Sequence, residues 1–236
     1  MSDFVRRKLA EHNIEQRTDA WYKAREGRLT ASDVAAAIGA NKHCTPTALT
    51  RRKLEPRSFF GNAATAWGQK YEPEAIAEYE RLSGNIVHEC GFFQHPTLPW
   101  IGGSPDGIVD TPASLEHGTP QNTKLLEVKC PYFKEIEPYC PAHYYPQAQT
   151  CLEVLDMEAC DFVQYVPATT FTVKKIIIIT IPRLRSWFDH QLPIMQKWFS
   201  DLEHARLHPR PRKEHIQRKI SKPRVRKAKP YMLIDL

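Results

Sequence analysis

The segment from Val173 to Ile181 contains four consecutive isoleucines, Ile176–Ile179, and this apolar run constrains the fold more than any other feature of the sequence. A membrane span needs roughly 18 apolar residues, so the run is far too short to be one. Side chains of a strand alternate between two faces, and here both faces are apolar. We therefore expect a strand inside a sheet that is covered on both sides.

The composition is that of a soluble globular protein. With 236 residues, 42% of them hydrophobic, the chain can build a substantial core and form one large domain or a domain with an appendage. Arg6, Arg7 and Lys8 lie near the N-terminus, but no apolar segment follows them, so we expect no secretory signal. We therefore expect an intracellular protein that is neither secreted nor bound to a membrane.

The six cysteines form no C-x-x-C pair, which argues against zinc-finger and iron–sulfur sites. A disulfide framework is not expected in a chain of this length without an export signal. Cys140 and His143 have a spacing that would suit half of a zinc site, but no second pair of metal ligands has a matching spacing.

Positive charge is concentrated at the C-terminal end. Residues 206–236 contain 11 lysines and arginines against 2 acidic residues, whereas residues 1–205 contain 22 against 25. The net charge is therefore +9 for residues 206–236 and −3 for residues 1–205. Such a basic segment neutralises phosphates, acts as a localisation signal or is a solvated tail without a partner. We expect a globular domain over residues 1–207 and a basic, flexible tail over residues 208–236.

The remaining pattern predicts helices on either side of a small mixed sheet, which is an α/β fold. Thr30 and Asp33 have the spacing of a capping box at a helix start, and Gly39 suits the end of that helix. Pro73 interrupts a long helical segment, where we expect a kink or a new start. The other predicted helices span 2–13, 46–54, 63–82, 146–155 and 183–207, and the strands span 86–89, 91–94, 108–109, 124–129, 162–166 and 173–181.

The turn Ser104–Gly107 and the later strand Leu126–Lys129 carry the main chemical signal. The two apolar residues of this strand point into a core, which leaves Glu127 and Lys129 together on the other face. A divalent cation explains two charges on such a face, because hard cations such as Mg²⁺ prefer carboxylate oxygens. Asp106, at the end of the neighbouring strand, supplies a second carboxylate. Lys129 would then help to hold an attacking hydroxide or the charge of a phosphate.

An isolated E-x-K pattern has a simpler explanation, because surface ion pairs are common. In that case Glu127 and Lys129 would form an exposed ion pair on an edge strand. The turn that contains Pro105 and Asp106 precedes this strand and favours the metal site instead.

Further blocks of sequence occur in the order of a known family. They are Ala20-Trp21 with Arg25, Thr30-Ala31-Ser32, Ala66-Trp67-Gly68, Tyr71-Glu72, Ser104-Pro105-Asp106-Gly107, Glu127-Val128-Lys129-Cys130-Pro131 and Gln147-Ala148-Gln149. On these blocks the chain resembles, from residue 16 to about residue 155, the phage lambda-type exonucleases of the YqaJ-like viral recombinase or viral alkaline exonuclease family. The resemblance implies a PD-(D/E)xK restriction-endonuclease-like core and a nuclease domain over residues 1–207.

The resemblance also implies a set of metal ligands. Asp106, Glu127 and the Val128 carbonyl match the ligands of the family, and Glu72 matches a helix-borne acid that completes the surroundings of a second metal. The cofactor is then Mg²⁺, with two ions expected and Mn²⁺ as an alternative.

Two further residues match catalytic positions of the family. Lys129 matches the catalytic lysine, and Gln147 matches a glutamine that orients the attacking water. Gln147 and Gln149 lie two residues apart and face different sides of a helix, so only one of them is expected to reach the metals. Gln147 is the one that the resemblance favours.

The phosphate-binding residues of the family match Arg25, Ser32 and Ser104. An arginine grips a phosphate with two parallel hydrogen bonds, and a serine at the start of a helix either caps the helix or faces an anion. The family has another arginine a few residues after the lysine, and here Lys134 would replace it. A lysine offers a point charge and no fork.

The implied activity is a Mg²⁺-dependent 5′→3′ exodeoxyribonuclease that acts on ends of double-stranded DNA and leaves a 3′ single strand for viral recombination or replication. A single-strand annealing protein and a homotrimer are the expected partners, and the cytoplasm or the nucleus of the host cell is the expected location. Two alternatives stay open at this point. One is another nuclease of the PD-(D/E)xK superfamily, an endonuclease or a repair nuclease, and the other is a non-catalytic DNA-binding module.

Overall fold

The computed structural model of the protein describes residues 1–12, 14–55, 61–113, 123–132 and 135–209. The helix Asp19–Arg25 and the short strands Leu29–Thr30 and Ile101–Gly103 were not predicted, and the other elements match the predictions to within a few residues. Within the described residues the helices are α1 (Asp3–His12), α2 (Asp19–Arg25), α3 (Ala31–Ala37), α4 (Pro46–Leu54), α5 (Ala63–Ser83), α7 (Tyr145–Leu155) and α8 (Arg185–Leu207). The strands are β1 (Leu29–Thr30), β2 (Ile86–His88), β3 (Phe93–Gln94), β4 (Ile101–Gly103), β5 (Gly107–Asp110), β6 (Thr123–Lys129), β7 (Ala159–Val166) and β8 (Lys175–Pro182).

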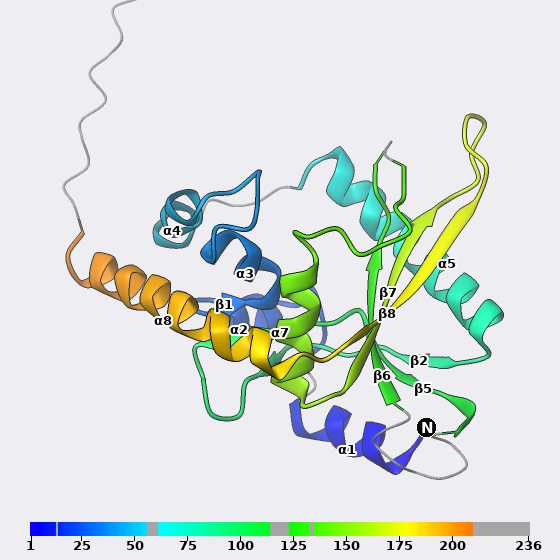
Figure 1. Ribbon diagram of the computed structural model, residues 1–236, viewed down its shortest axis with the longest axis horizontal. Coiled ribbons are helices and arrows are strands. Elements are labelled where there is room, and N and C mark those ends of the chain that lie inside the picture. Colours follow the sequence, from blue (N-terminus) through cyan, green and yellow to red (C-terminus); the bar gives the residue numbers. More distant parts are fainter. Residues whose placement is uncertain (13, 56–60, 114–122, 133–134, 210–236) are drawn as a thin grey trace, which may run out of the picture.

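The larger of the two sheets has the strand order β2-β5-β6-β7-β8, and helices lie on both sides of it (Figure 1). Strands β6 and β7 are parallel and the other pairs are antiparallel, so the sheet is mixed, as predicted. Strands β5 and β6 are paired antiparallel, with Gly107 opposite Leu126. The smaller sheet has the order β1-β4-β3. This register places the turn before β5 beside the C-terminal half of β6.

The prediction that the isoleucine run lies inside a covered sheet is wrong. Strand β8 contains this run and is the edge strand, paired with β7 alone in the sheet. Of the four isoleucines in the run, three are half-buried, and Ile178 is 37% exposed. Both faces are apolar because Ile179 packs against the core cluster on one side of the sheet and Ile176 against the cluster on the other side.

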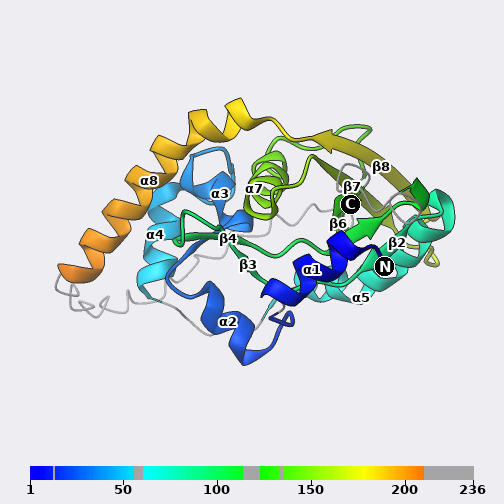
Figure 2. The same cartoon turned by 90° about the horizontal axis from the view of Figure 1, so that it is seen from below.

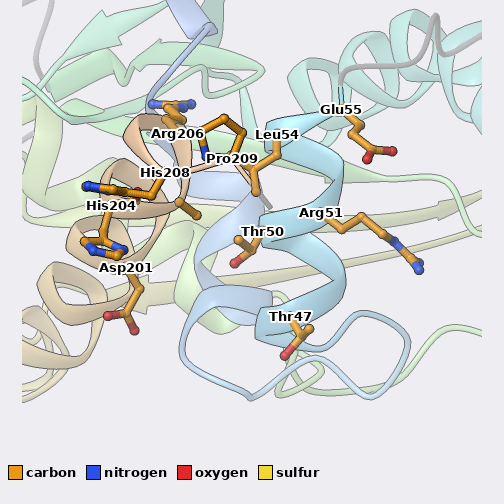
Figure 3. Close-up of a pocket in the computed structure, with 11 residues that line it drawn as sticks. Thr47, Thr50, Arg51, Leu54, Glu55, Asp201, His204, Arg206, His208 and Pro209 are labelled. Atoms are coloured by element: carbon orange, nitrogen blue, oxygen red, sulfur yellow. The ribbon is translucent and has the colours of Figure 1, made fainter. Parts of the chain in front are cut away.

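Helices α4 and α8 pack against each other at the end of the molecule remote from α5 (Figure 2). An open cavity of about 840 Å³ lies between them. Figure 3 shows the side chains that line it, which come from α4, from the C-terminal part of α8 and from the residues directly after each helix. In the described part of the chain, no helix is both long enough and apolar enough to span a bilayer.

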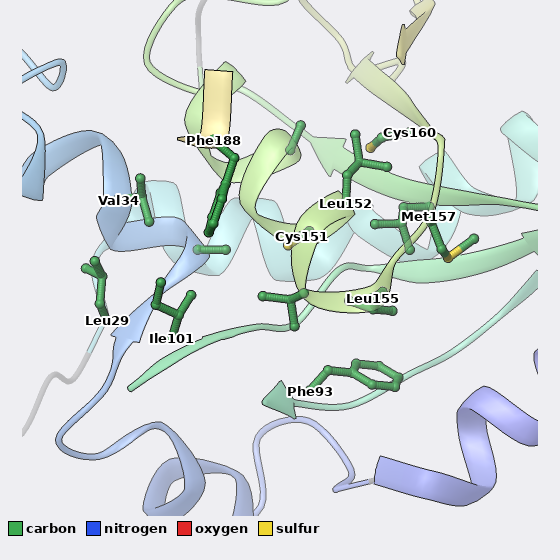
Figure 4. Packing of buried hydrophobic residues seen from close by; sticks show 14 of the residues in the cluster. Leu29, Val34, Phe93, Ile101, Cys151, Leu152, Leu155, Met157, Cys160 and Phe188 are labelled. Carbon is green, nitrogen blue, oxygen red and sulfur yellow. The ribbon is translucent and has the colours of Figure 1, made fainter. Parts of the chain in front are cut away.

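Two clusters of buried apolar side chains lie on the two faces of the larger sheet. The first contains residues of α3, α7 and α8 together with alternate residues of the strands (Figure 4). The second lies under α5, whose Tyr79 is fully buried. Alternation along β6 divides its residues between the clusters, with Leu125 in the first and Leu126 and Val128 in the second. The charged face of β6 therefore points toward α7.

Two local predictions need correction. Thr30 stands at the start of α3, but its hydroxyl donates to Asp33 at 3.0 Å and accepts no backbone N–H, so there is no capping box. Helix α5 continues through Pro73 as one helix from Ala63 to Ser83, without a new start. Gly84 ends α5 with a φ of 70°, a left-handed conformation that glycine adopts without strain. The six cysteines are free, as the absence of a predicted disulfide framework requires.

Candidate active site

The side chain of Glu127 is the centre of the site. Glu127 is 1% exposed, and its Oε1 accepts hydrogen bonds from the Lys129 ammonium and, at 2.6 Å, from the Gln147 amide of α7. Its Oε2 is buried and has no hydrogen-bond partner within the described residues. A buried carboxylate oxygen without a donor is costly, so this atom is suited to a cation.

Asp106 lies directly before β5 and is tied to β6 on both sides of Glu127. Its backbone N–H donates to the Leu126 carbonyl at 3.0 Å, and its Oδ2 accepts the Val128 N–H at 2.7 Å. The two bonds fix the carboxylate of Asp106 next to that of Glu127. The hairpin register thus brings together two acids that are 21 positions apart in the sequence.

The protonation states of Glu127, Asp106 and Lys129 depend on one another. Burial raises the pKa of Glu127 to about 8, with Lys129 opposing the rise and Asp106 adding to it. Burial also raises the pKa of Asp106, against the charge of Lys129. Burial lowers the pKa of Lys129, but the charges of Glu127 and Asp106 outweigh this and raise it above its usual value. A single ammonium compensates two buried acids, so the site favours additional positive charge.

Glu72 of α5 is linked electrostatically to the same site, but Arg17 holds it. The Arg17 Nη2 donates to both carboxylate oxygens of Glu72, at 3.0 and 3.1 Å. Burial and the charge of Asp106 raise the pKa of Glu72, while Arg17 and Lys129 oppose the rise. Glu72 therefore lies close enough to Asp106 for their charges to interact, and it has a partner that the sequence did not indicate.

The residues present suit a hard divalent cation. Within the described residues, no three Asp, Glu, His or Cys side chains form a ready-made metal site, and this includes Cys140 and His143, whose spacing would have suited half of a zinc site. Two adjacent carboxylates, one with an unpartnered oxygen, are nevertheless the donors that Mg²⁺ or Mn²⁺ prefers. The role of the Val128 carbonyl stays a prediction.

The two glutamines of α7 have separate surroundings. Gln147 reaches Glu127, whereas Gln149 is 1% exposed and bonds the segment before α8, donating to the Pro182 carbonyl at 2.8 Å and accepting the Leu184 N–H at 2.8 Å. Of the two, only Gln147 can contact the reacting groups.

The three predicted phosphate-binding residues meet at one corner. The Arg25 guanidinium donates to Ser104 at 3.4 Å and to Ser32 at 3.5 Å. It lies 4.0 Å from the ring centroid of Trp21, whose Nε1 donates to the Ser104 hydroxyl at 2.9 Å. The corner is built for an anion, because an arginine and two hydroxyls converge there. Lys134 lies outside the described residues.

The sequence did not assign roles to Trp21 and Arg17. Trp21 belongs to a block that matches the family, so its partnership with Arg25 had a signal in the sequence, although its bond to Ser104 did not. Arg17 contacts Glu72 across 55 positions of sequence, and no local pattern indicates such a contact.

The cavity between α4 and α8 contains none of the predicted site residues. Its charged side chains include Asp201, which pairs with Lys197 at 2.8 Å, and Arg206, which pairs with Glu203. These pairs leave little unbalanced charge among the acidic and basic groups of α8, so the cavity lacks the features of the carboxylate site.

The model of the YqaJ-like viral recombinase domain matches residues 20–158, which is more than half of the chain and contains Asp106, Glu127 and Lys129. The chain belongs to the YqaJ-like viral recombinase family. The resemblance that was based on the sequence blocks is thereby confirmed. All the predicted site residues lie within the matched range.

Viral proteins are among the relatives of this YqaJ-like chain. Uncharacterized protein R354 of Acanthamoeba polyphaga mimivirus is 31% identical over 159 residues, which cover 64% of this chain and 29% of the relative. Protein D345L of African swine fever virus (strain Badajoz 1971 Vero-adapted) is 28% identical over 173 residues, which cover 64% of this chain and 49% of the relative. The YqaJ-like chain thus spans at most about half the length of these relatives.

Solved structures share the fold of this YqaJ-like chain. The alkaline exonuclease LHK-Exo from Laribacter hongkongensis has a TM-score of 0.64 and 27% identity, with 81% of this chain and 95% of that chain covered, and it is also known in complex with dAMP. The phage related exonuclease from Haemophilus somnus 129PT has a TM-score of 0.54 at 17% identity, covering 75% and 95%, and supports the fold alone. The predicted PD-(D/E)xK fold class is confirmed, and the family is one of nuclease enzymes.

Proposed function

We propose that this chain is a Mg²⁺-dependent exodeoxyribonuclease that digests one strand of double-stranded DNA from its 5′ end. The observation that supports this most is the unpartnered Oε2 of buried Glu127, which lies next to Asp106. Membership of the YqaJ-like family and the fold shared with LHK-Exo support the same activity.

The metal ligands in this proposal are Asp106, Glu127, the Val128 carbonyl and Glu72. Two Mg²⁺ ions bound by these groups would supply Lewis acidity at the scissile phosphate, and Mn²⁺ suits the same oxygen ligands. The protein contributes the alignment: the two hydrogen bonds of Asp106 to β6 keep it beside Glu127 before any substrate arrives.

Lys129 and Gln147 act on the reacting groups themselves. The Lys129 ammonium donates to the phosphate oxygen on which negative charge increases, and the Gln147 side chain orients the attacking water. The oxygen of this water bonds to phosphorus while the bond from phosphorus to the 3′ oxygen breaks. The water's protons pass to the leaving 3′ oxygen and to solvent. The remaining strand therefore carries a new 5′-phosphate after each step.

The corner formed by Arg25, Ser32 and Ser104 supports the 5′→3′ direction. A guanidinium and two hydroxyls suit the terminal 5′-phosphate, which every cleavage regenerates. The complex of LHK-Exo with dAMP supports binding of a nucleotide by a protein of this fold. Lys134 takes part as a second cation for the same phosphate in this proposal.

The wider setting is proposed from the family resemblance. The product is a 3′ single strand for viral recombination or replication, a single-strand annealing protein receives it, and a homotrimer retains the DNA. The basic segment 208–236 adds contacts to DNA phosphates, which confer affinity without sequence preference.

A comparison of end-labelled duplexes tests this activity. The experiment uses linear DNA that carries a 5′-phosphate or a 5′-hydroxyl, labelled at the 5′ or the 3′ end, with Mg²⁺ or with EDTA. We expect mononucleotides from the 5′ end, only in Mg²⁺, and faster release from the 5′-phosphate. The variant Ser104→Ala should slow release from the phosphorylated end more than from the hydroxyl end.

Covalently closed circular DNA separates the alternatives. Cleavage of the circle at a rate similar to that of the linear duplex would indicate an endonuclease and contradict the proposal. Binding of both DNAs without any Mg²⁺-dependent cleavage would indicate a non-catalytic DNA-binding module.

A further inference from the structure

Arg17 has a backbone conformation that is unusual for its residue type. Its φ is 66°, and Arg17 and Asp156 are the non-glycine residues with a positive φ in the described part of the chain. Asp156 ends helix α7, where a left-handed residue is common. Arg17 precedes α2 and ends no helix. A left-handed conformation is unfavourable for a residue with a side chain, and such strain is concentrated at functional sites.

The segment before Arg17 is anchored to the active-site turn. The Gln16 side chain donates to the Cys90 carbonyl at 2.9 Å and to the Pro105 carbonyl at 3.0 Å, and Pro105 directly precedes Asp106. Gly91 packs so closely on this segment that an added Cβ would lie 1.7 Å from the Ile14 carbonyl oxygen. The backbone at Arg17 is therefore held in a fixed position relative to the site.

From this position the guanidinium of Arg17 reaches Glu72. A single nitrogen, Nη2, contacts both oxygens of Glu72, while Nε and Nη1 bond no group among the described residues. The side chain is 48% exposed. Three N–H groups, one on Nε and two on Nη1, therefore remain available to a second anion next to the carboxylates.

A divalent ion and Arg17 would compete for Glu72. The carboxylate has both oxygens on one guanidinium nitrogen, and the proposed function requires the same carboxylate near an ion.

We propose that Arg17 is shared between Glu72 and the DNA. In the ion-free protein it holds Glu72, and when a divalent ion takes this carboxylate the guanidinium turns to the phosphate at the scissile bond. Arg17 is then a positioning residue for Glu72 and a phosphate-binding residue in the loaded site. This inference rests on the proposed function, since it needs both the ion and the phosphate.

The variant Arg17→Gly tests the inference with little risk to the fold, because glycine adopts a φ of 66° without strain. Calorimetric titration of the DNA-free protein with Mn²⁺ should give affinity about fivefold tighter than wild type, because the competing guanidinium is gone. On duplex DNA at saturating Mg²⁺, kcat should fall about tenfold or more, because the phosphate loses its fork. Arg17→Lys should recover only part of kcat.

The matched control is Arg81→Ala. Arg81 forms a similar pair with Glu78, also on α5, but Glu78 takes no part in the proposed site. Arg81→Ala should leave Mn²⁺ affinity and kcat at wild-type values. Unchanged Mn²⁺ affinity or unchanged kcat in Arg17→Gly would overturn the inference, and so would full recovery of kcat by Arg17→Lys. If the wild-type protein cleaves no DNA at all, the proposed function fails, whereas the Mn²⁺ titration still reports on Arg17 and Glu72.

Discussion

The two faces of the larger sheet at strand β6 have buried carboxylates in opposite circumstances. On the face under α5, Asp161 of the neighbouring β7, which lies opposite Leu126, accepts hydrogen bonds from the Tyr79 hydroxyl at 2.7 Å, the Thr180 hydroxyl at 2.6 Å and the Lys124 ammonium at 3.1 Å. On the face toward α7, Glu127 has one oxygen with two donors and the other with none. Asp161 is 2% exposed and Glu127 is 1% exposed, so burial is equal and only the supply of donors differs.

This difference separates a structural acid from a functional one. Each face of the sheet at β6 has an acid and a lysine, so residue type alone does not distinguish the two faces. A carboxylate whose oxygens are all bonded stabilises the fold, whereas a buried oxygen without a donor reduces stability unless a cation binds to it. The comparison can be tested by removing charge on each face.

The largest effect is expected from Glu127→Gln. We expect kcat for duplex DNA to fall about a thousandfold, because the ion loses its central carboxylate. The melting temperature should stay equal or rise, because the amide removes a buried charge. Activity assays and thermal unfolding of the same preparation measure both. A variant that keeps the wild-type rate would show that the unpartnered oxygen has no catalytic role.

The second-largest effect on kcat is expected from Lys129→Met. We expect kcat to fall about a hundredfold, because the phosphate loses a donor aimed at its developing charge. The matched control is Lys124→Met, which removes the ammonium that pairs with Asp161 on the other face and should leave kcat per folded molecule unchanged. Equal losses of kcat in the two variants would contradict the distinction between the two faces.

Asp161→Asn should lower stability and leave catalysis unchanged, which is the reverse of what we expect from Glu127→Gln. We expect the free energy of unfolding in urea to fall by about 2 kcal/mol, because the amide group cannot accept all the donors that surround Asp161. Cleavage per folded molecule should not change. A large loss of kcat at full stability would mean that this network belongs to the active site.

The smallest effect is a difference in pH dependence, measured in EDTA. The pKa of Glu127 is raised from its ordinary value of 4.5 to about 8, so between these values the folded state binds more protons than the unfolded state. The free energy of unfolding should therefore fall as pH rises through this window. Glu127→Gln lacks this contribution, so the melting temperature of the variant should rise relative to that of wild type as the pH increases from about 5 to about 8. Parallel curves for the two proteins would contradict the raised pKa.

Much of the fold was predictable because its signals are local. The alternation along β6 correctly indicated that Glu127 and Lys129 face away from Leu126 and Val128, and the turn before β5 indicated a neighbouring acid. The isoleucine run correctly indicated a strand. Its position in the sheet was predicted wrongly, because an edge strand that contacts both core clusters has the same apolar pattern as a central one.

The sequence by itself determined which residues lie on the same face of one element and which blocks belong to the family, because these depend on the two-residue period of a strand and on motif order. Only the tertiary structure decided which side chains meet across elements. The bond of Trp21 to Ser104, the contact of Gln147 with Glu127 and the pairing of Arg17 with Glu72 span 83, 20 and 55 positions. Such contacts depend on how helices pack against the sheet, and packing is a property of the whole chain.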